Sequence, residues 1–355
     1  MLRFSNFLFP EARTPEDDAR IIEESVAEAK LCEALGVEVL WLAEHHFDGN
    51  CAYVDPVTFA AAILSATTRL KVGFAVAQVS LHHPMRLAEQ MSLLDNLSKG
   101  RVIVGLGRGT AYNIYEYQGY GIPAEEAGER YAEAEAVMLK AWTSPGGFTH
   151  EGKFWSLRVP QFRPRPYTRP HPAVIRGASS EEGALHLARR GLPFLMNVQT
   201  NAVTRERLAA YRATMEGAGF DAAHIARCLD GSWVWRNVVV ADTDEEARRI
   251  GVPAFEAMSA QRKAMREKIQ AEQGVSMEKA AKVHAHSDVT KGLLCGSPET
   301  VAASMAEIDA TGVGGVICAF RLGPMTAEQT NRSIRLFMEK VAPRFRRSEV
   351  AAAAE

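Results

Sequence analysis

The chain lacks several features that would assign it to common protein classes. Its 355 residues contain no apolar stretch that approaches the roughly 20 residues of a membrane-spanning helix. The N-terminus is not expected to be a secretory signal, because Asn6 interrupts its apolar part and Pro10 follows soon after. A formal net charge of −2 gives no electrostatic reason to expect binding to nucleic acid or to an anionic membrane.

Cysteine is scarce, and familiar metal motifs are missing. The five cysteines are widely scattered, and none forms a Cys-x-x-Cys pair. An odd number without a pattern argues against a disulfide framework and predicts a reducing, cytoplasmic location. There is no His-Glu-x-x-His, and the first apolar run lacks the His-x-His of barrel metallohydrolases. A catalytic metal is therefore not predicted.

Short apolar runs alternate with helical patterns along the whole chain. Hydrophobic residues make up 47% of the sequence and charged residues 24%, which is enough to build a sizeable core. The runs expected to form strands cover residues 2–9, 37–43, 70–79, 101–107, 173–177, 193–198, 232–241 and 315–320. Eight strands separated by helices predict an α/β fold, a (β/α)8 TIM barrel.

Three segments interrupt this alternation. Insertions are expected after strands 4 and 7, as rim loops at residues 110–128 and 274–292. Residues 145–172 are rich in proline, glycine and aromatic residues and predict an irregular excursion with a short hairpin. We expect one barrel domain over residues 1–348, followed by a flexible tail at 349–355.

Chemistry is expected where the strands end, because the carboxyl ends of parallel strands meet at one rim of a barrel. The tetrad Glu44-His45-His46-Phe47 ends the second run and brings titratable groups to that rim. A surface histidine pair is the simpler alternative. The rim candidates are Glu44, His45, Gln78, Arg108, Ser179, Asn197 and Arg321.

The fourth and fifth strands end in motifs that suit an anionic ligand. Residues 105–109 read Gly-x-Gly-x-Gly, which lacks the spacing of a dinucleotide-binding fingerprint, and we expect the glycines to allow close backbone approach to a ligand. Arg108 would hold a phosphate or a ring carbonyl, with a plain strand-end arginine as the alternative. Ser179 and Ser180 precede a helix, where free N–H groups bind anions, although an ordinary serine cap is equally consistent. Aromatic residues predicted to line an apolar pocket near the rim are Phe7, Tyr112, Tyr115, Tyr117, Trp233 and Trp235.

Several long motifs, taken in order, resemble the FMN-using branch of the bacterial luciferase-like family of flavin-dependent monooxygenases. They lie at residues 6–7, 41–47, 83–90, 93–101, 105–109 and 296–301. The resemblance implies a (β/α)8 barrel and a homodimer formed through the second and third helices, with the alanine-rich segment 59–66 packing between subunits. The luciferases carry a reactive cysteine where this chain has Gly107, which puts light emission in doubt.

The resemblance also implies roles for individual residues. Arg108, Ser179 and Ser180 would hold the FMN phosphate, and a non-prolyl cis peptide between Ala75 and Val76 would support the flavin ring. His45 matches the catalytic histidine of the luciferases. Glu44 is expected to orient it, unless strand alternation points the two side chains apart.

The reaction implied is that of a two-component monooxygenase. A separate flavin reductase would supply reduced FMN, O2 would add at the flavin C4a carbon, and the resulting peroxide would transfer one oxygen atom to a small organic substrate. The alternatives are a deazaflavin-dependent oxidoreductase on the same barrel and a non-catalytic flavin-binding protein. Hydroxylation, epoxidation, Baeyer–Villiger insertion and desulfonation all stay open.

Overall fold

The computed structural model describes residues 1–109, 113–274 and 289–345. In this part of the chain, eight parallel strands form the barrel: β1 (Arg3–Leu8), β2 (Val39–Leu42), β3 (Lys71–Phe74), β5 (Val102–Gly107), β8 (Ala173–Ala178), β9 (Phe194–Val198), β10 (Trp233–Val240) and β12 (Gly315–Ala319). β12 pairs with β1, and β10 pairs with both β9 and β12, which closes the ring. The predicted (β/α)8 barrel is confirmed.

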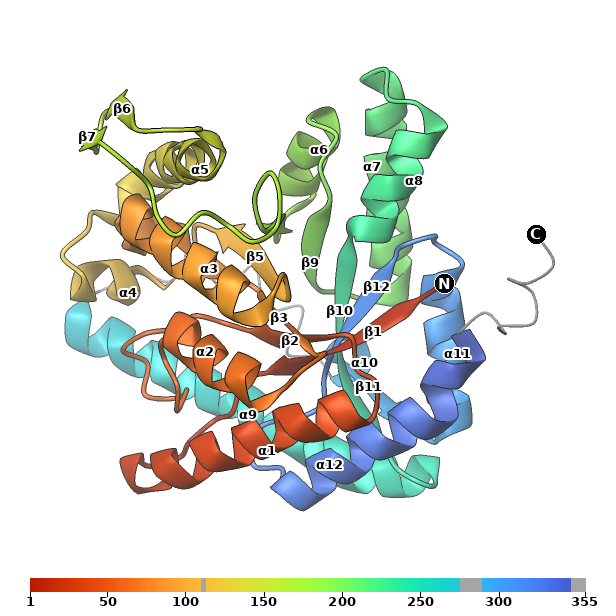
Figure 1. The fold of residues 1–355 in the computed structure, drawn as a ribbon. Helices are drawn as coiled ribbons and strands as arrows, with labels where there is room; N and C mark the ends of the chain where they lie inside the picture. The colour runs from red at the N-terminus through yellow and green to blue at the C-terminus, as the bar shows by residue number, and fades with distance from the viewer. Residues whose placement is uncertain (110–112, 275–288, 346–355) are drawn as a thin grey trace.

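Helices lie between the strands and cover the outside of the barrel, with α1, α2 and α3 in front in Figure 1. The main ones are α1 (Asp18–Ala34), α2 (Pro56–Ala66), α3 (Pro84–Ser98), α5 (Ala127–Thr143), α6 (Glu181–Arg189), α7 (Asn201–Gly217), α9 (Asp244–Gln273), α11 (Pro298–Asp309) and α12 (Ala327–Leu336). Their starts carry local signals: the Asp55 side chain accepts from the backbone N of Val57 at 2.9 Å, with proline at the first helical position. Among the described residues, no helix combines the length and apolar character that a membrane span requires.

The barrel interior is filled by side chains from alternate strand positions. Trp41 and Trp233 meet edge to face with ring centroids 5.6 Å apart. A Cβ at Gly73 would lie 2.4 Å from the Trp41 ring, and one at Gly315 would lie 2.3 Å from the Trp233 ring, so only glycine leaves room for these indoles. The Trp41 Nε1 donates to the Ser5 hydroxyl at 3.0 Å, which satisfies the buried donor. The centre of the barrel is therefore a packed core and not a channel.

The structure departs from the predicted elements in several places. The third run is split into β3 and the short β4 (Ala77–Gln78). An unpredicted strand, β11 (Leu293–Gly296), pairs with the C-terminal half of β10. Helices α4 (Ile114–Gly119) and α8 (Ala222–Gly231) were not expected. Most of the predicted insertion 274–292 and the whole tail 349–355 lie outside the described residues; α10 (Val289–Gly292) ends the insertion.

The excursion at residues 145–172 contains the expected hairpin, formed by β6 (Phe148–Glu151) and β7 (Ser156–Val159). It lies beside α5 in Figure 1, away from the barrel strands. The carboxylate of Glu133 on α5 fastens it by accepting from the backbone N of Phe154 and Trp155 at 3.0 and 3.1 Å and from His150 Nε2 at 3.0 Å. The hairpin is thus bound to the outer layer of helices.

Candidate active site

The tetrad Glu44-His45-His46-Phe47 directly follows β2, beside the end of β1. Tyr53 fixes these two strand ends relative to one another, because its buried hydroxyl donates to the Leu8 carbonyl at 2.9 Å and accepts from the Ala43 N at 3.0 Å. Nothing in the sequence pattern singled out Tyr53. Its two hydrogen bonds place the tetrad at the carboxyl rim, as predicted from the strand order.

Glu44 is buried, and its carboxylate serves His46 and His82 instead of His45. Oε1 accepts from His46 Nε2 at 2.9 Å and from His82 Nε2 at 2.7 Å, and Oε2 accepts from the backbone N of Gln78 at 2.7 Å. Burial by itself would raise the pKa of Glu44, but these hydrogen bonds outweigh it and hold the pKa at about 2. The expectation that Glu44 orients His45 is therefore wrong, since these bonds direct its carboxylate to other groups.

The low pKa of Glu44 predicts a loss of stability in acid. In the unfolded chain this carboxyl has its ordinary pKa of 4.5, so its contribution is complete above that pH and is lost as the pH falls towards 2. The gap corresponds to about 3 kcal/mol. Urea unfolding of wild type and Glu44→Gln should differ most at neutral pH, and the difference should shrink between pH 5 and pH 3. Glu23→Gln, at an exposed position on α1, is the control; a difference that stays constant with pH would contradict the prediction.

The carboxylate that does contact His45 belongs to Glu116 on α4. Glu116 Oε1 accepts from His45 Nδ1 and from the backbone N of His46, both at 3.0 Å, while Oε2 accepts from Gln78 Nε2 at 3.0 Å. The Glu116 side chain is 0% exposed and that of His45 is 29% exposed. The pair therefore joins a buried anion to an imidazole that solvent and ligands can reach.

This pairing sets the proton chemistry of His45. Burial favours neutral imidazole, but the hydrogen bond and negative charge of Glu116 outweigh it and raise the pKa of His45 above its usual range. Because a carboxylate only accepts, Nδ1 carries the hydrogen and Nε2 is left as the atom that exchanges a proton. Sequence reasoning missed Glu116, whose only signal was a lone acid between Tyr115 and Tyr117 in the rim segment after strand 4.

The peptide bond between Ala75 and Val76, which separates β3 from β4, is cis, as predicted. Both residues are half-buried, so part of their surface is exposed at the rim. A Cβ at Gly107 would lie 2.3 Å from Val76 Cγ2, and one at Gly105 would lie 1.6 Å from the Phe74 carbonyl. These two glycines therefore make room for β3 and Val76, which corrects the expectation that they serve close approach to a ligand.

Arg108 and the start of α6 form a second polar group at the rim. The Arg108 side chain is exposed, and it makes no hydrogen bond or ion pair with any other described residue. Ser180 caps α6 by accepting from the Gly183 N at 3.1 Å, so the simpler interpretation of this serine holds. Ser179 and Gly177 are exposed beside it. The guanidinium and the helix N-terminus lie after neighbouring strands, because β5 pairs with β8.

The other predicted rim residues differ in burial and in the contacts they make. Arg321 follows the end of β12, but its side chain is buried and pairs with Glu24 and Glu28 on α1. Asn197 is half-buried at the end of β9 and accepts from Gln199 at 3.0 Å. Among the aromatic candidates, Phe7 and Trp235 contact each other with centroids 4.1 Å apart, whereas Trp233 packs in the barrel core and Tyr115 and Tyr117 are buried. Tyr112 lies outside the described residues.

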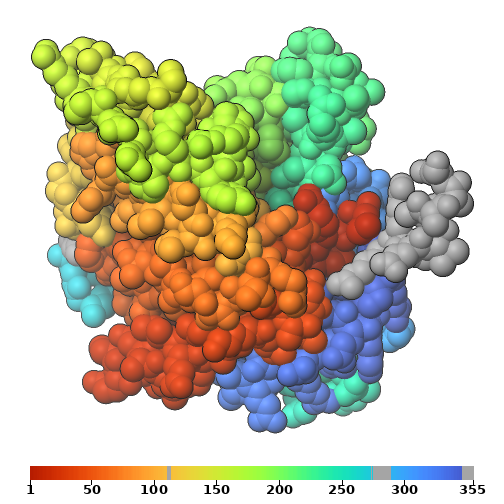
Figure 2. Space-filling view, in the orientation of Figure 1, coloured from red at the N-terminus to blue at the C-terminus, as the bar shows by residue number. Residues whose placement is uncertain are grey.

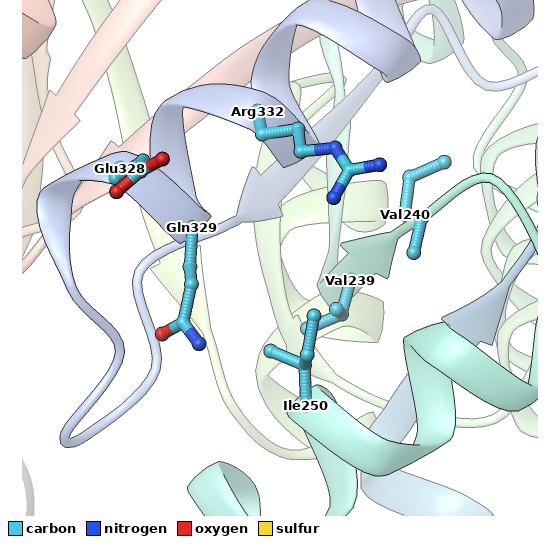
Figure 3. A pocket seen from close by; sticks show the side chains of 7 residues that line it. Val239, Val240, Ile250, Glu328, Gln329 and Arg332 are labelled. Atoms are coloured by element: carbon cyan, nitrogen blue, oxygen red, sulfur yellow. The ribbon is translucent and has the colours of Figure 1, made fainter.

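A small pocket lies away from these residues, between β10, α9 and α12 (Figure 3). Its volume of about 90 Å³ is well below the roughly 300–1,000 Å³ of typical small-molecule sites. Its one cation, Arg332, is already paired with Asp242 and Glu246. The pocket contains none of the predicted site residues.

Comparison with known proteins assigns the chain. The sequence model of the family described as luciferase-like monooxygenase matches residues 2–315. The chain belongs to the luciferase-like monooxygenase family. This confirms the resemblance to the family seen in the sequence, and with it the predicted enzyme class, a monooxygenase.

Curated relatives of this luciferase-like chain act on different molecules. Limonene 1,2-monooxygenase of Rhodococcus erythropolis is 28% identical over 69% of the chain and 62% of the relative. The oxygenase component of the flavin-dependent trigonelline monooxygenase of Acinetobacter baylyi is 26% identical over 52% of each protein. The matches thus span between half and two thirds of these relatives.

Solved structures share the fold over nearly the full length. Monooxygenase RslO1 from Streptomyces bottropensis has a TM-score of 0.79 at 26% identity and covers 97% of this luciferase-like chain and 100% of its own. The FMN complex of the oxygenating constituent of 3,6-diketocamphane monooxygenase from Pseudomonas putida has a TM-score of 0.76 at 19% identity. The match covers 97% of this chain and 98% of the other. An F420-dependent secondary alcohol dehydrogenase has a TM-score of 0.72 at 16% identity, and the match covers 96% of this chain and 98% of the other. The last two show the fold alone.

Proposed function

We propose that the chain is the oxygenase component of a two-component system that uses reduced FMN supplied by a separate flavin reductase. The observation that carries this proposal is the combination found at one rim of the barrel. There, the carboxylate-bound His45, the partly exposed Ala75 and Val76, and the exposed Arg108 all lie at the ends of strands β2 to β5.

The residues present fit a flavin mononucleotide. The exposed Arg108 guanidinium makes no hydrogen bond or ion pair within the described part of the chain, and the N-terminus of α6 offers backbone N–H groups beside Ser179, which together suit a phosphate. Ala75 and Val76 are partly exposed at the end of β3, between β2, which His45 follows, and β5, which Arg108 follows, so a planar ring would lie against them. The oxygenase component of trigonelline monooxygenase supports the two-component arrangement.

In this proposal the flavin supplies oxygen activation, and the protein supplies position and proton control. His45 holds or moves a proton at Nε2, because Glu116 occupies Nδ1. The Gln78 side-chain amide donates both to the backbone carbonyl of Glu44 at 2.8 Å and to Glu116 Oε2 at 3.0 Å, so Gln78 positions the carboxylate that contacts His45.

Binding of FMN tests the proposal most directly. We expect Arg108→Ala to weaken FMN binding by about 10-fold to 100-fold, since a charge-assisted contact to phosphate is lost. The measurement is quenching of flavin fluorescence during titration, with riboflavin as the comparison because it lacks the phosphate. Arg86→Ala, an exposed change on α3, is the control. Equal loss of FMN and riboflavin affinity would contradict a phosphate role.

The same titration separates the alternatives. A deazaflavin cofactor bound in preference to FMN would favour a deazaflavin-dependent oxidoreductase, for which the F420-dependent neighbour shows that the fold is compatible. FMN bound without any oxygen-dependent turnover across a substrate panel would favour a non-catalytic flavin-binding protein.

We also propose a homodimer formed through α2 and α3, which lie on the face towards the viewer in Figure 2. Leu93 and Leu97, one turn apart on α3, are 51% and 59% exposed. On α2, Phe59 and Ile63 face the protein's own core, so within 59–66 only small residues such as Ala62 and Ser65 are exposed to a second subunit. Light scattering of the purified protein tests this assembly.

A further inference from the structure

A guanidinium lies near His45 that no part of the proposed flavin site uses. The loops after β1 and β2 are joined by an antiparallel bridge between Glu11 and Cys51 and by the Ala12 N donating to the Asn50 carbonyl at 2.8 Å. The second half of α9 packs onto these loops, and Gln261 Nε2 donates to Asn50 Oδ1 at 2.8 Å. The next residue, Arg262, is thereby fixed at the rim.

The Arg262 side chain is paired with Glu11 on one side and exposed to solvent on the other. Its NH2 group lies 3.1 Å from Glu11 Oε1; the Glu11 side chain is 3% exposed, whereas that of Arg262 is 38% exposed. The guanidinium also lies 5.7 Å from the centroid of the Phe9 ring. No other ion pair or hydrogen bond joins the Arg262 side chain to a described residue, so several of its five N–H donors are open.

An aromatic row leads to this guanidinium. The Trp235 and Phe7 centroids are 4.1 Å apart, Phe7 stacks on Phe9 at 6.1 Å, and Phe9 meets the His45 ring edge to face at 5.4 Å. The row begins on β10 and β1, on the opposite side of the ring from β3 and β5, which carry the proposed flavin site. Trp235 is half-buried, whereas Phe7 and Phe9 are 5% and 7% exposed, and the row ends beside a proton-exchanging imidazole and a cation.

We propose that Arg262 is the anion-recognition residue of the substrate site and that the substrate is an amphiphilic organic acid. This proposal rests on the proposed oxygenase function. The acid's oxyanion pairs with Arg262, and its apolar body lies along Phe9, Phe7 and Trp235, next to His45. One guanidinium, partly neutralised by Glu11, suits a single negative charge such as a carboxylate or sulfonate better than a phosphate dianion.

Calorimetric titration with matched probes tests the proposal. The protein is first saturated with FMN, so that Arg108 is occupied, and then titrated with benzoate, benzenesulfonate and uncharged benzamide, and with octanoate and octanamide. We expect the acids to bind at least about 10-fold more tightly than the amides, which corresponds to one lost charged contact. The carboxylate and sulfonate arms show which oxyanion is preferred.

Variants attribute the preference to one side chain. Arg262→Gln should abolish the preference for acids, and Arg262→Lys should retain part of it. Arg248→Gln removes an arginine from the first half of α9 that pairs with Asp244 at 3.6 Å, and it should leave the preference unchanged. Thermal unfolding of each variant measures the structural cost of losing the Glu11 contact.

Three results would overturn the proposal: no preference for any acid over its amide, a preference that survives Arg262→Gln, or a loss of acid and amide binding in equal proportion. Failure of the oxygenase function is distinguishable, because it appears as absent FMN binding or absent oxygen uptake. A preference for acids that depends on Arg262 would stand without either.

Discussion

Replacing Glu116 by glutamine should lower the pKa of His45 and slow oxygenation by about 100-fold. In the wild-type protein the negative charge of Glu116 raises the pKa of His45 against the effect of burial. A neutral amide removes that charge, so burial should prevail and bring the pKa below its usual range. Glutamine would also place an N–H2 group towards the amide of Gln78, which now donates to Glu116 Oε2 at 3.0 Å.

An NMR titration of the His45 imidazole measures the shift, and oxygen uptake against pH measures its effect on turnover. In the variant, both profiles should move to lower pH, which a general loss of folding would not produce. Glu125→Gln makes the same chemical change at an exposed position nearby and should leave both profiles unchanged. An unshifted His45 titration in Glu116→Gln would rule out the orienting role.

Introducing a side chain at Gly107 should weaken FMN binding by about 100-fold or more, equivalent to roughly 3 kcal/mol. A Cβ at this position lies 2.3 Å from Val76 Cγ2, a distance that forces Val76 to move. Because Val76 belongs to the surface proposed to support the flavin ring, its displacement should disturb the ring and not the phosphate. Gly107→Cys is the most informative change, since the luciferases carry a cysteine there.

The double variant Gly107→Cys, Val76→Ala tests the steric cause. It removes the clashing methyl groups, and the remaining Val76 Cβ lies 3.1 Å from the added Cβ, so most of the affinity should return. Flavin fluorescence titration measures binding, and thermal unfolding monitors the fold. Gly146→Cys, at a glycine with no heavy atom within 4 Å of an added Cβ, is the control. Wild-type FMN affinity in Gly107→Cys alone would refute the argument.

The order of strands and helices could be predicted because the residue pattern that indicates each element lies within its own segment of the sequence. Buried strands such as 37–43 are short apolar runs, and helix starts such as Asp55-Pro56 carry capping residues within a few positions. The short strand β11 was missed, because Leu293–Gly296 follows an insertion and pairs only with the C-terminal half of β10. The hydrogen bonds that define such a strand are made with distant residues, and no local pattern reports them.

The sequence by itself determined the barrel, the tetrad at its rim and the family, since these depend on periodicity and on long motifs. It could not decide which carboxylate contacts which histidine. Glu44 is adjacent to His45 in the chain but is bonded to His46 and His82, whereas Glu116, far away in sequence, is bonded to His45. Likewise, Arg262 comes near His45 only because α9 packs across the loops after β1 and β2. Such pairings depend on the directions of side chains brought together by packing, which only the tertiary structure sets.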